Sequence, residues 1–237
     1  MSAVSESIAR AFDLIVHADP VLVRTVALSF AVSGTACLAA AWLGLVAGAW
    51  LAARRFVGRQ VVLLVLDTLL ALPSVVVGLL VYLLLSRSGP LGSLGILFTP
   101  PAMVIAQAIL VLPIVAALAH QVVADALRDG GDQMRSFGAG PLLCALLMLL
   151  HERWAVATLL LIAFGRAIAE VGAVMIVGGN IDGVTRVMTT TIALETSKGD
   201  LPLALALGLV LLAVVAVLNV AIAAMRTMAS PRPVEAR

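Results

Sequence analysis

The 237 residues are 62% hydrophobic and 12% charged, whereas a typical globular domain is about 25% charged. This composition excludes an ordinary soluble domain, because so short a chain could not enclose so much apolar surface. The formal net charge of +2 resides mainly in short segments between apolar blocks, so it informs membrane topology and does not indicate a nucleic-acid surface. The two cysteines, Cys37 and Cys144, stand far apart in apolar surroundings, which excludes a disulfide framework or a CxxC site.

The apolar blocks predict an all-α integral membrane protein that forms one transmembrane domain over residues 1–237. A helix that spans a bilayer needs ~20 mostly apolar residues. Five stretches meet this requirement: 25–53, 61–85, 101–121, 154–178 and 201–225.

Residues 1–20 contain only one arginine, and Asp13 interrupts their apolar run. This pattern does not fit a cleavable signal peptide, so we expect a short amphipathic helix on the membrane surface. Asp19 is predicted to cap the first spanning helix, and Pro20 to occupy its first position.

Prolines and arginines mark the next features of the chain. The first span ends in a loop with Arg54, Arg55 and Arg59 and no acidic residue, which places this loop in the cytoplasm by the positive-inside rule. Pro73 in the second span and Pro113 in the third are expected to kink their helices.

Five spans place the two termini on opposite sides of the membrane. With the N-terminus outside, the inner segments 52–60, 122–153 and 226–237 hold nine arginines, and the outer segments hold five lysines and arginines. The charge bias therefore predicts an external N-terminus and a cytoplasmic C-terminus.

One long polar stretch interrupts the apolar sequence, from Ala124 to Trp154. We interpret it as a cytoplasmic docking surface for a soluble partner. The chain has no GxxxxGK[ST] phosphate loop, no HExxH zinc motif and no evident nucleophile–base pair. We therefore expect no catalytic site, no metal site and no bound cofactor, and an energy source on another subunit.

The spacing inside this stretch resembles the EAA loop of ABC importer permeases. Asp132-Gln133-Met134 stands six residues before Gly138, and Met148-Leu-Leu-His151 begins ten residues after that glycine. The family pattern is EAA, three residues, Gly, nine residues and I-x-L-P. Asp, Gln-Met and His replace its Glu, Ala-Ala and Pro. The resemblance implies two short helices joined by a glycine turn, the first over residues 124–137, lying against an ATPase subunit.

Two further stretches, Leu72–Ile114 and Ala163–Gly208, closely resemble permeases of the molybdate/tungstate ABC importers, most nearly the tungstate branch. The second contains Gly165-Arg166, Glu170-x-Gly172, Gly178-Gly179-Asn180 and Thr185-Arg186. The resemblance implies a MetI-like type I permease core in a bacterial inner membrane. It also implies a homodimer, two cytoplasmic ATPases that bind ATP and Mg, and a periplasmic oxyanion-binding protein. Tungstate is the expected substrate, followed by molybdate, and sulfate is less expected.

Two groups of site residues follow from these patterns. The predicted ATPase-coupling loop contains Asp132, Gln133, Met134, Gly138, Ala139, Glu152 and Arg153. The predicted translocation path or intramembrane charge pair contains Arg166, Glu170, Gly172, Asn180 and Arg186.

Arg166 and Glu170 are four residues apart, which predicts a shared helix face. Each charge at mid-bilayer costs about 2.5–3.5 kcal/mol, so we expect the two to pair, and a structural role is favoured over contact with substrate. The threonines at 185 and 189–191 are also expected to be structural, and the role of Arg186 stays open. The alternatives are an ion-coupled carrier or channel that uses Arg166 and Glu170 as a charge relay, and a membrane assembly protein without transport.

Overall fold

The computed structural model describes residues 3–136 and 138–229, which are almost entirely helical and contain no strand. This confirms the predicted all-α fold. The elements are α1 (Ala3–Val16), α2 (Pro20–Ala53), α3 (Arg59–Leu70), α4 (Ser74–Leu85), the 3₁₀ turn η1 (Gly92–Leu94), α5 (Pro100–Ser136), α6 (Pro141–His151), α7 (Arg153–Ile168), α8 (Gly172–Gly178), α9 (Met188–Lys198) and α10 (Leu201–Ala229).

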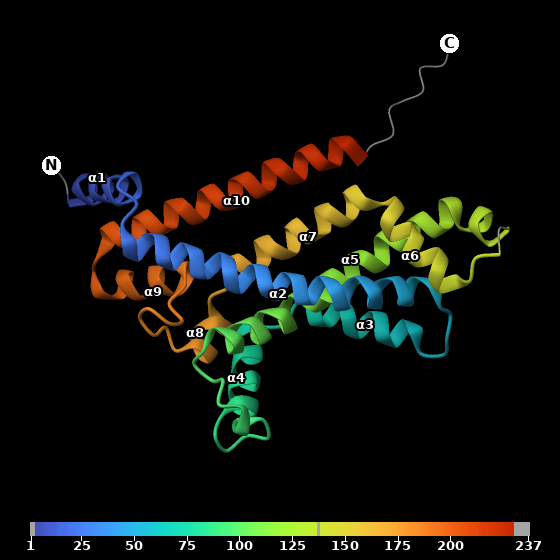
Figure 1. Cartoon of the computed structure of the whole chain (residues 1–237), viewed down its shortest axis with the longest axis horizontal. Helices are drawn as coiled ribbons and strands as arrows, with labels where there is room; N and C mark the ends of the chain where they lie inside the picture. The colour runs from blue at the N-terminus through green and yellow to red at the C-terminus, as the bar shows by residue number, and fades with distance from the viewer. Residues whose placement is uncertain (1–2, 137, 230–237) are drawn as a thin grey trace, which may run out of the picture.

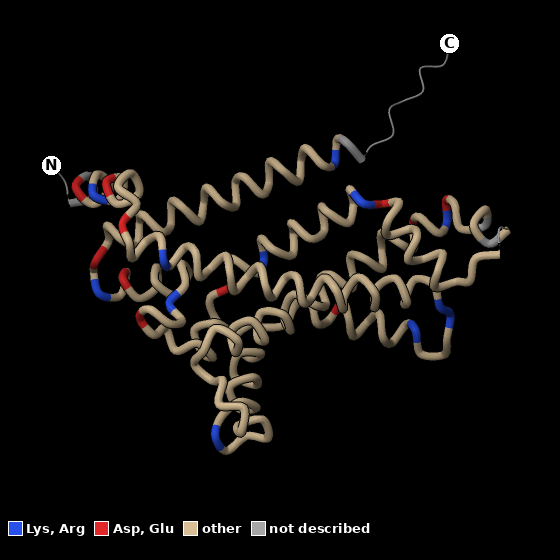
Figure 2. Tube along the Cα trace, in the orientation of Figure 1, with Lys and Arg blue, Asp and Glu red and all other residues tan. Residues whose placement is uncertain are grey.

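The long helices α2, α5, α7 and α10 run roughly along the long axis of the molecule, and α4 projects sideways from it (Figure 1). Within the described residues, α2, α5 and α10 are each long and apolar enough to cross a membrane alone, and counting the bent pairs α3–α4 and α6–α7 as one span each gives up to five. Charged residues gather at the two ends of the long axis and in the loops, and few lie between (Figure 2). This distribution matches a multi-pass membrane protein.

The start of α2 follows the prediction. Asp19 is its N-cap, and the carboxylate oxygen Oδ1 accepts hydrogen bonds from the backbone N–H groups of Val21 at 2.9 Å and Leu22 at 3.1 Å. Pro20 takes the first helical position, where its missing N–H is not needed. Before this cap, α1 forms as predicted, and its buried Ala11 belongs to the same apolar cluster as Ala206 and Leu207 of α10.

The second predicted span, 61–85, is not one helix. It breaks into α3 and α4, which meet at an angle of 100°. Pro73 stands at the break as the N-cap of α4, and a proline there lacks an N–H donor and pushes the preceding residue out of the helical conformation. The predicted disruption at Pro73 is therefore confirmed in a sharper form than a kink. α5, in contrast, continues through Pro113.

The helix of the third span continues past the predicted end of that span at residue 121. α5 runs on to Ser136, so the helix expected over residues 124–137 is the continuation of the spanning helix as far as the described residues reach. The reason is visible in the sequence, because no glycine or proline stands between Pro113 and Gly130.

The fourth predicted span, 154–178, is also broken. α7 ends at Ile168 and α8 begins at Gly172. A Cβ on Gly172 would lie 2.8 Å from the Ser74 hydroxyl oxygen and 2.9 Å from Cγ2 of Val75, so only glycine allows α8 to start this close to α4. The carboxylate of Glu170 also accepts the backbone N–H of Ala173 at 3.2 Å, which satisfies one of the free donors at the new helix start.

Small residues let α2 and α5 pack closely at the centre of the bundle. A Cβ on Gly48 would come within 2.5 Å of the Ala116 carbonyl oxygen and 2.7 Å of the Ala119 Cβ. Around this buried centre, large apolar side chains such as Trp42 (74% exposed) and Leu212 (67% exposed) face outward. In water such a surface would be unfavourable, but it suits lipid or a second membrane subunit.

Candidate functional site

The end of α5 and the helix α6 enclose a groove with a volume of about 460 Å³. Gly138 makes the turn between them with φ of +84°, a conformation that glycine adopts without the steric cost of a Cβ. The groove is lined by Ala126, Asp129, Gly130, Gln133, Met134, Met148, His151 and Glu152. The glycine turn between two helices, predicted from the spacing, is thus confirmed.

The structure brings three of the predicted coupling residues together, because Gln133, Met134 and Glu152 all line this groove. Ala139 follows the turn and donates its backbone N–H to the Met134 carbonyl at 3.4 Å. Arg153 begins α7 and lies over the ring of Trp154 at 5.9 Å. The side chain of Asp132 lies outside the described residues, as does Phe137.

Sequence reasoning missed Asp129 as a groove residue. It precedes Gln133 by four positions on α5, so the helical repeat places both on one face. Met148 is buried among apolar residues at the α5–α6 contact, and acidic and polar side chains share the groove lining with it. A lining that combines a buried apolar residue with polar groups suits a protein partner.

The predicted ion pair forms, although its setting differs from the prediction. Arg166 Nη1 lies 2.7 Å from Glu170 Oε2, and the Glu170 side chain is 4% exposed while that of Arg166 is 45% exposed. Glu170 does not share a helix with Arg166, because α7 has already ended at Ile168. The ion pair instead connects the last turn of α7 to the segment that follows it.

Glu170 joins several elements at the break between α7 and α8. Its carboxylate accepts the N–H of Ala173 on α8 and a hydrogen bond from the Ser74 hydroxyl on α4. Its backbone carbonyl accepts the Thr189 hydroxyl of α9 at 2.7 Å. These contacts favour the structural role, since each holds a different helix to the same residue.

Gln107 was not identified from the sequence. It is 3% exposed on α5, and its side-chain Nε2 donates to the Ala167 carbonyl at 2.9 Å. This bond ties the middle of α5 to the last turn of α7, next to the break. A glutamine within an apolar block is the only signal that the sequence offered.

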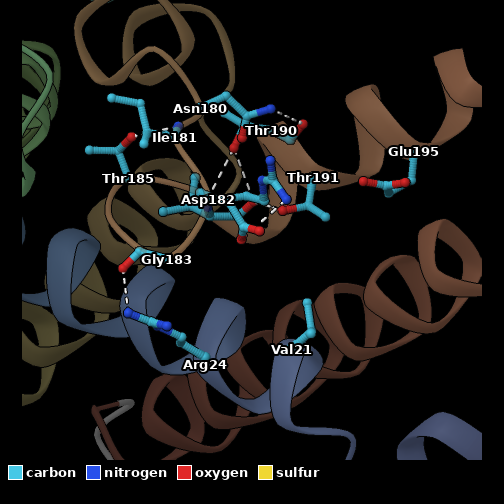
Figure 3. A network of polar contacts seen from close by, with 12 residues as sticks. Val21, Arg24, Asn180, Ile181, Asp182, Gly183, Thr185, Thr190, Thr191 and Glu195 are labelled. Carbon is cyan, nitrogen blue, oxygen red and sulfur yellow. Dashed lines mark hydrogen bonds and ion pairs between the residues drawn. The ribbon is translucent and has the colours of Figure 1, made fainter.

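The loop after α8 supplies the remaining predicted residues. Asn180 takes a left-handed φ of +50° and donates its side-chain amide to the Thr190 carbonyl at 3.4 Å. Arg186 Nη1 lies 3.2 Å from Asp182 Oδ1. Figure 3 shows this network between the loop and α9, and it is a cluster distinct from the Arg166–Glu170 pair.

The threonine hydroxyls in this region all bond to backbone carbonyls. Thr185 donates to Gly178 at 2.6 Å, Thr190 to Val187 at 3.1 Å and Thr191 to Val187 at 2.7 Å. All three side chains are buried. Their contacts support the expected structural role and leave recognition of a ligand to other groups.

Comparison with known proteins adds independent evidence. No family model matches this chain. It is 40% identical over 226 residues to the tungstate uptake system permease protein TupB of Peptoclostridium acidaminophilum, covering 94% of this chain and 97% of that protein. It is 43% identical over 203 residues to a probable anion ABC transporter permease protein of Haloferax volcanii, covering 84% and 88%. It is 29% identical over 194 residues to the putative molybdenum transport system permease protein YvgM of Bacillus subtilis, covering 76% and 82%.

The first two relatives match along most of both chains, and their names agree with the helical architecture and with the groove at the EAA position. The chain therefore belongs to the family of ABC transporter permeases that includes the tungstate uptake permeases.

Proposed function

We propose that this chain is the membrane subunit of an ABC importer that carries tungstate, with molybdate as the second candidate substrate. It works as a homodimer, with an ATPase subunit on each α5–α6 groove and an oxyanion-binding protein on the opposite side of the membrane. The N-terminus is external and the C-terminus cytoplasmic. ATP and Mg bind to the ATPase, and this chain carries out no chemistry and binds no cofactor.

The observation that carries the proposal is the groove between α5 and α6. Its lining residues Asp129, Gln133 and Glu152 stand at the end of the molecule away from α1 and α9 (Figure 1). A groove with a glycine turn, built on a helix that also spans the membrane, provides a rigid connection from a soluble motor to the transport path.

The test is tungstate uptake into proteoliposomes that contain the permease, its ATPase and its binding protein. Uptake should require ATP, and Asp129→Lys should reduce both uptake and the amount of ATPase that co-purifies. Glu6→Lys, the same charge reversal on the exposed face of α1, is the matched control and should leave both unchanged. Uptake by the permease alone, driven by an ion gradient, would overturn the proposal in favour of an ion-coupled carrier.

A further inference from the structure

A second cavity lies at the end of the molecule opposite the coupling groove. It has a volume of about 380 Å³ and lies between the first turns of α2 and the loop that follows α8. Its polar lining consists of Arg24, Thr25, Asp182, Gly183 and Arg186, and Pro20, Val21 and Leu28 complete the wall. Figure 3 shows Arg24 of α2 in contact with Gly183 of the loop, next to Asp182. In the proposed orientation this cavity opens on the outside.

Arg24 is held in place from the far side of the cavity. Its Nη2 donates to the Gly183 carbonyl at 2.5 Å, which uses one of the five N–H donors of the guanidinium. Gly183 has φ of +69°, and a Cβ there would lie 3.1 Å from Nη1 of Arg24. The glycine therefore leaves room for the guanidinium to lie flat against the loop.

Arg186 approaches from the loop itself, and one of its N–H donors lacks an acceptor. Its side chain is 19% exposed, and Nη1 pairs with Asp182 at 3.2 Å. Its Nε is buried, with no hydrogen-bond partner among the described residues. A buried donor without an acceptor is unfavourable by about 1–3 kcal/mol, so the described residues satisfy the guanidinium of Arg186 only in part.

The charge balance identifies the kind of acceptor. Two guanidinium groups face one carboxylate, and the side chain of Asp182 is 76% exposed, so water weakens its compensation. The nearby Asp19 carboxylate already accepts two N–H groups of α2. The cavity is therefore net positive, and guanidinium forks match the oxygen atoms of a tetrahedral oxyanion.

We propose that Arg24 and Arg186 form a binding site for a tetrahedral oxyanion at the external mouth of the transport path. The choice of this ligand rests on the proposed function. The site binds through charge and N–H donors, while the neighbouring threonine hydroxyls are occupied by backbone carbonyls. It therefore receives tungstate, molybdate or sulfate with little discrimination, and selection falls to the binding protein.

Equilibrium binding of labelled tungstate to the purified permease–ATPase complex, without binding protein, tests the site directly. Arg24→Gln and Arg186→Gln should each weaken binding about tenfold, the loss expected for one charged hydrogen-bonding partner. Asp182→Asn removes the competing carboxylate and should tighten binding. Arg87→Gln, an exposed arginine outside this cavity, is the matched control and should leave binding unchanged.

Several results would overturn the site. These are unchanged binding in both arginine variants, an equal loss in Arg87→Gln, or weaker binding in Asp182→Asn. If Arg24→Gln fails to assemble, Arg24→Lys keeps the charge without the fork and should bind with intermediate affinity. Weaker attachment of the binding protein without any change in tungstate binding would make the arginines a protein contact and overturn the oxyanion site.

Uptake measured in parallel separates this inference from the proposed function. A wild-type complex that imports no tungstate, yet binds it in an arginine-dependent way, refutes the proposed function and supports the site. A complex that imports tungstate, and whose binding is independent of both arginines, supports the function and refutes the site.

Discussion

Removing either partner of the Arg166–Glu170 pair should have unequal effects, because the two side chains differ in burial. Glu170 is 4% exposed and Arg166 is 45% exposed in the single subunit. Arg166→Gln leaves a buried carboxylate without its cation, which costs roughly 3–5 kcal/mol for a fully buried pair. The Ala173 N–H and the Ser74 hydroxyl still bind that carboxylate, so we expect about 3 kcal/mol, the lower end of that range.

Glu170→Gln should be milder. The Gln side chain keeps an oxygen that can accept the Ala173 N–H, and the half-exposed guanidinium of Arg166 remains accessible, so the loss should be about 1 kcal/mol, as for exposed pairs. The double change leaves no charge unpaired and should be close to Glu170→Gln alone. Arg166→Gln is thus the least stable of the three variants.

The assay is the unfolding free energy of the purified complex, with tungstate uptake measured alongside. Arg128→Gln is the matched control, because Arg128 pairs with Asp125 on the surface, where the two side chains are 75% and 65% exposed, and its loss should be below about 1 kcal/mol. A double variant as unstable as Arg166→Gln would refute the structural reading. If all three variants fold normally and the double variant is as inactive as Arg166→Gln, Arg166 belongs to the substrate path.

Three further predictions concern the groove, the topology and the core. Gly138→Trp should abolish ATPase co-purification and uptake while the protein still inserts, since φ of +84° strains any side chain there; undiminished association would refute the coupling role. Cysteines introduced at Ser88 and Thr227, with Cys37 and Cys144 replaced, should label from opposite sides of intact cells, and labelling of both from outside would disprove the topology. Gly48→Ala should destabilise the α2–α5 contact by about 1–3 kcal/mol, while Gly34→Ala, with no atom within 4 Å of the new Cβ, should be neutral or stabilising. Equal effects at the two glycines would contradict the packing argument.

Local signals in the sequence were sufficient for local structure. The Asp19–Pro20 helix start and the Gly138 turn were predicted because each depends on the conformational preferences of one or two residues. The all-α membrane class followed from the apolar composition and from the length of the apolar blocks. The resemblance to the EAA loop grouped Gln133, Met134 and Glu152 in one predicted loop, and all three line the same groove.

The helix breaks and the long-range contacts could not be predicted from the sequence, for a physical reason. Hydropathy averages the apolar residues over a window and carries no information on direction. The two short helices α3 and α4, which meet at 100°, therefore have the same hydropathy as one straight span. The break at Glu170 depends on contacts with Ala173, Ser74 and Thr189 from three other segments. Arg24 meets Gly183 across 159 positions of sequence, and no pattern near either residue indicates the other.

The uninterrupted course of α5 has a mechanical consequence. Its 37 residues extend about 55 Å at 1.5 Å per residue, from the neighbourhood of α8 to the groove residues Asp129 and Gln133. Pro113 lies inside it and removes one backbone hydrogen bond, but the helix continues through that residue. If it pivots at one end by ~5°, the other end moves by about 5 Å, roughly one helical turn. The Gln107 side chain bonds α5 to the Ala167 carbonyl, beside the break between α7 and α8. A displacement at the groove is therefore transmitted to the residues around Glu170 through one helix.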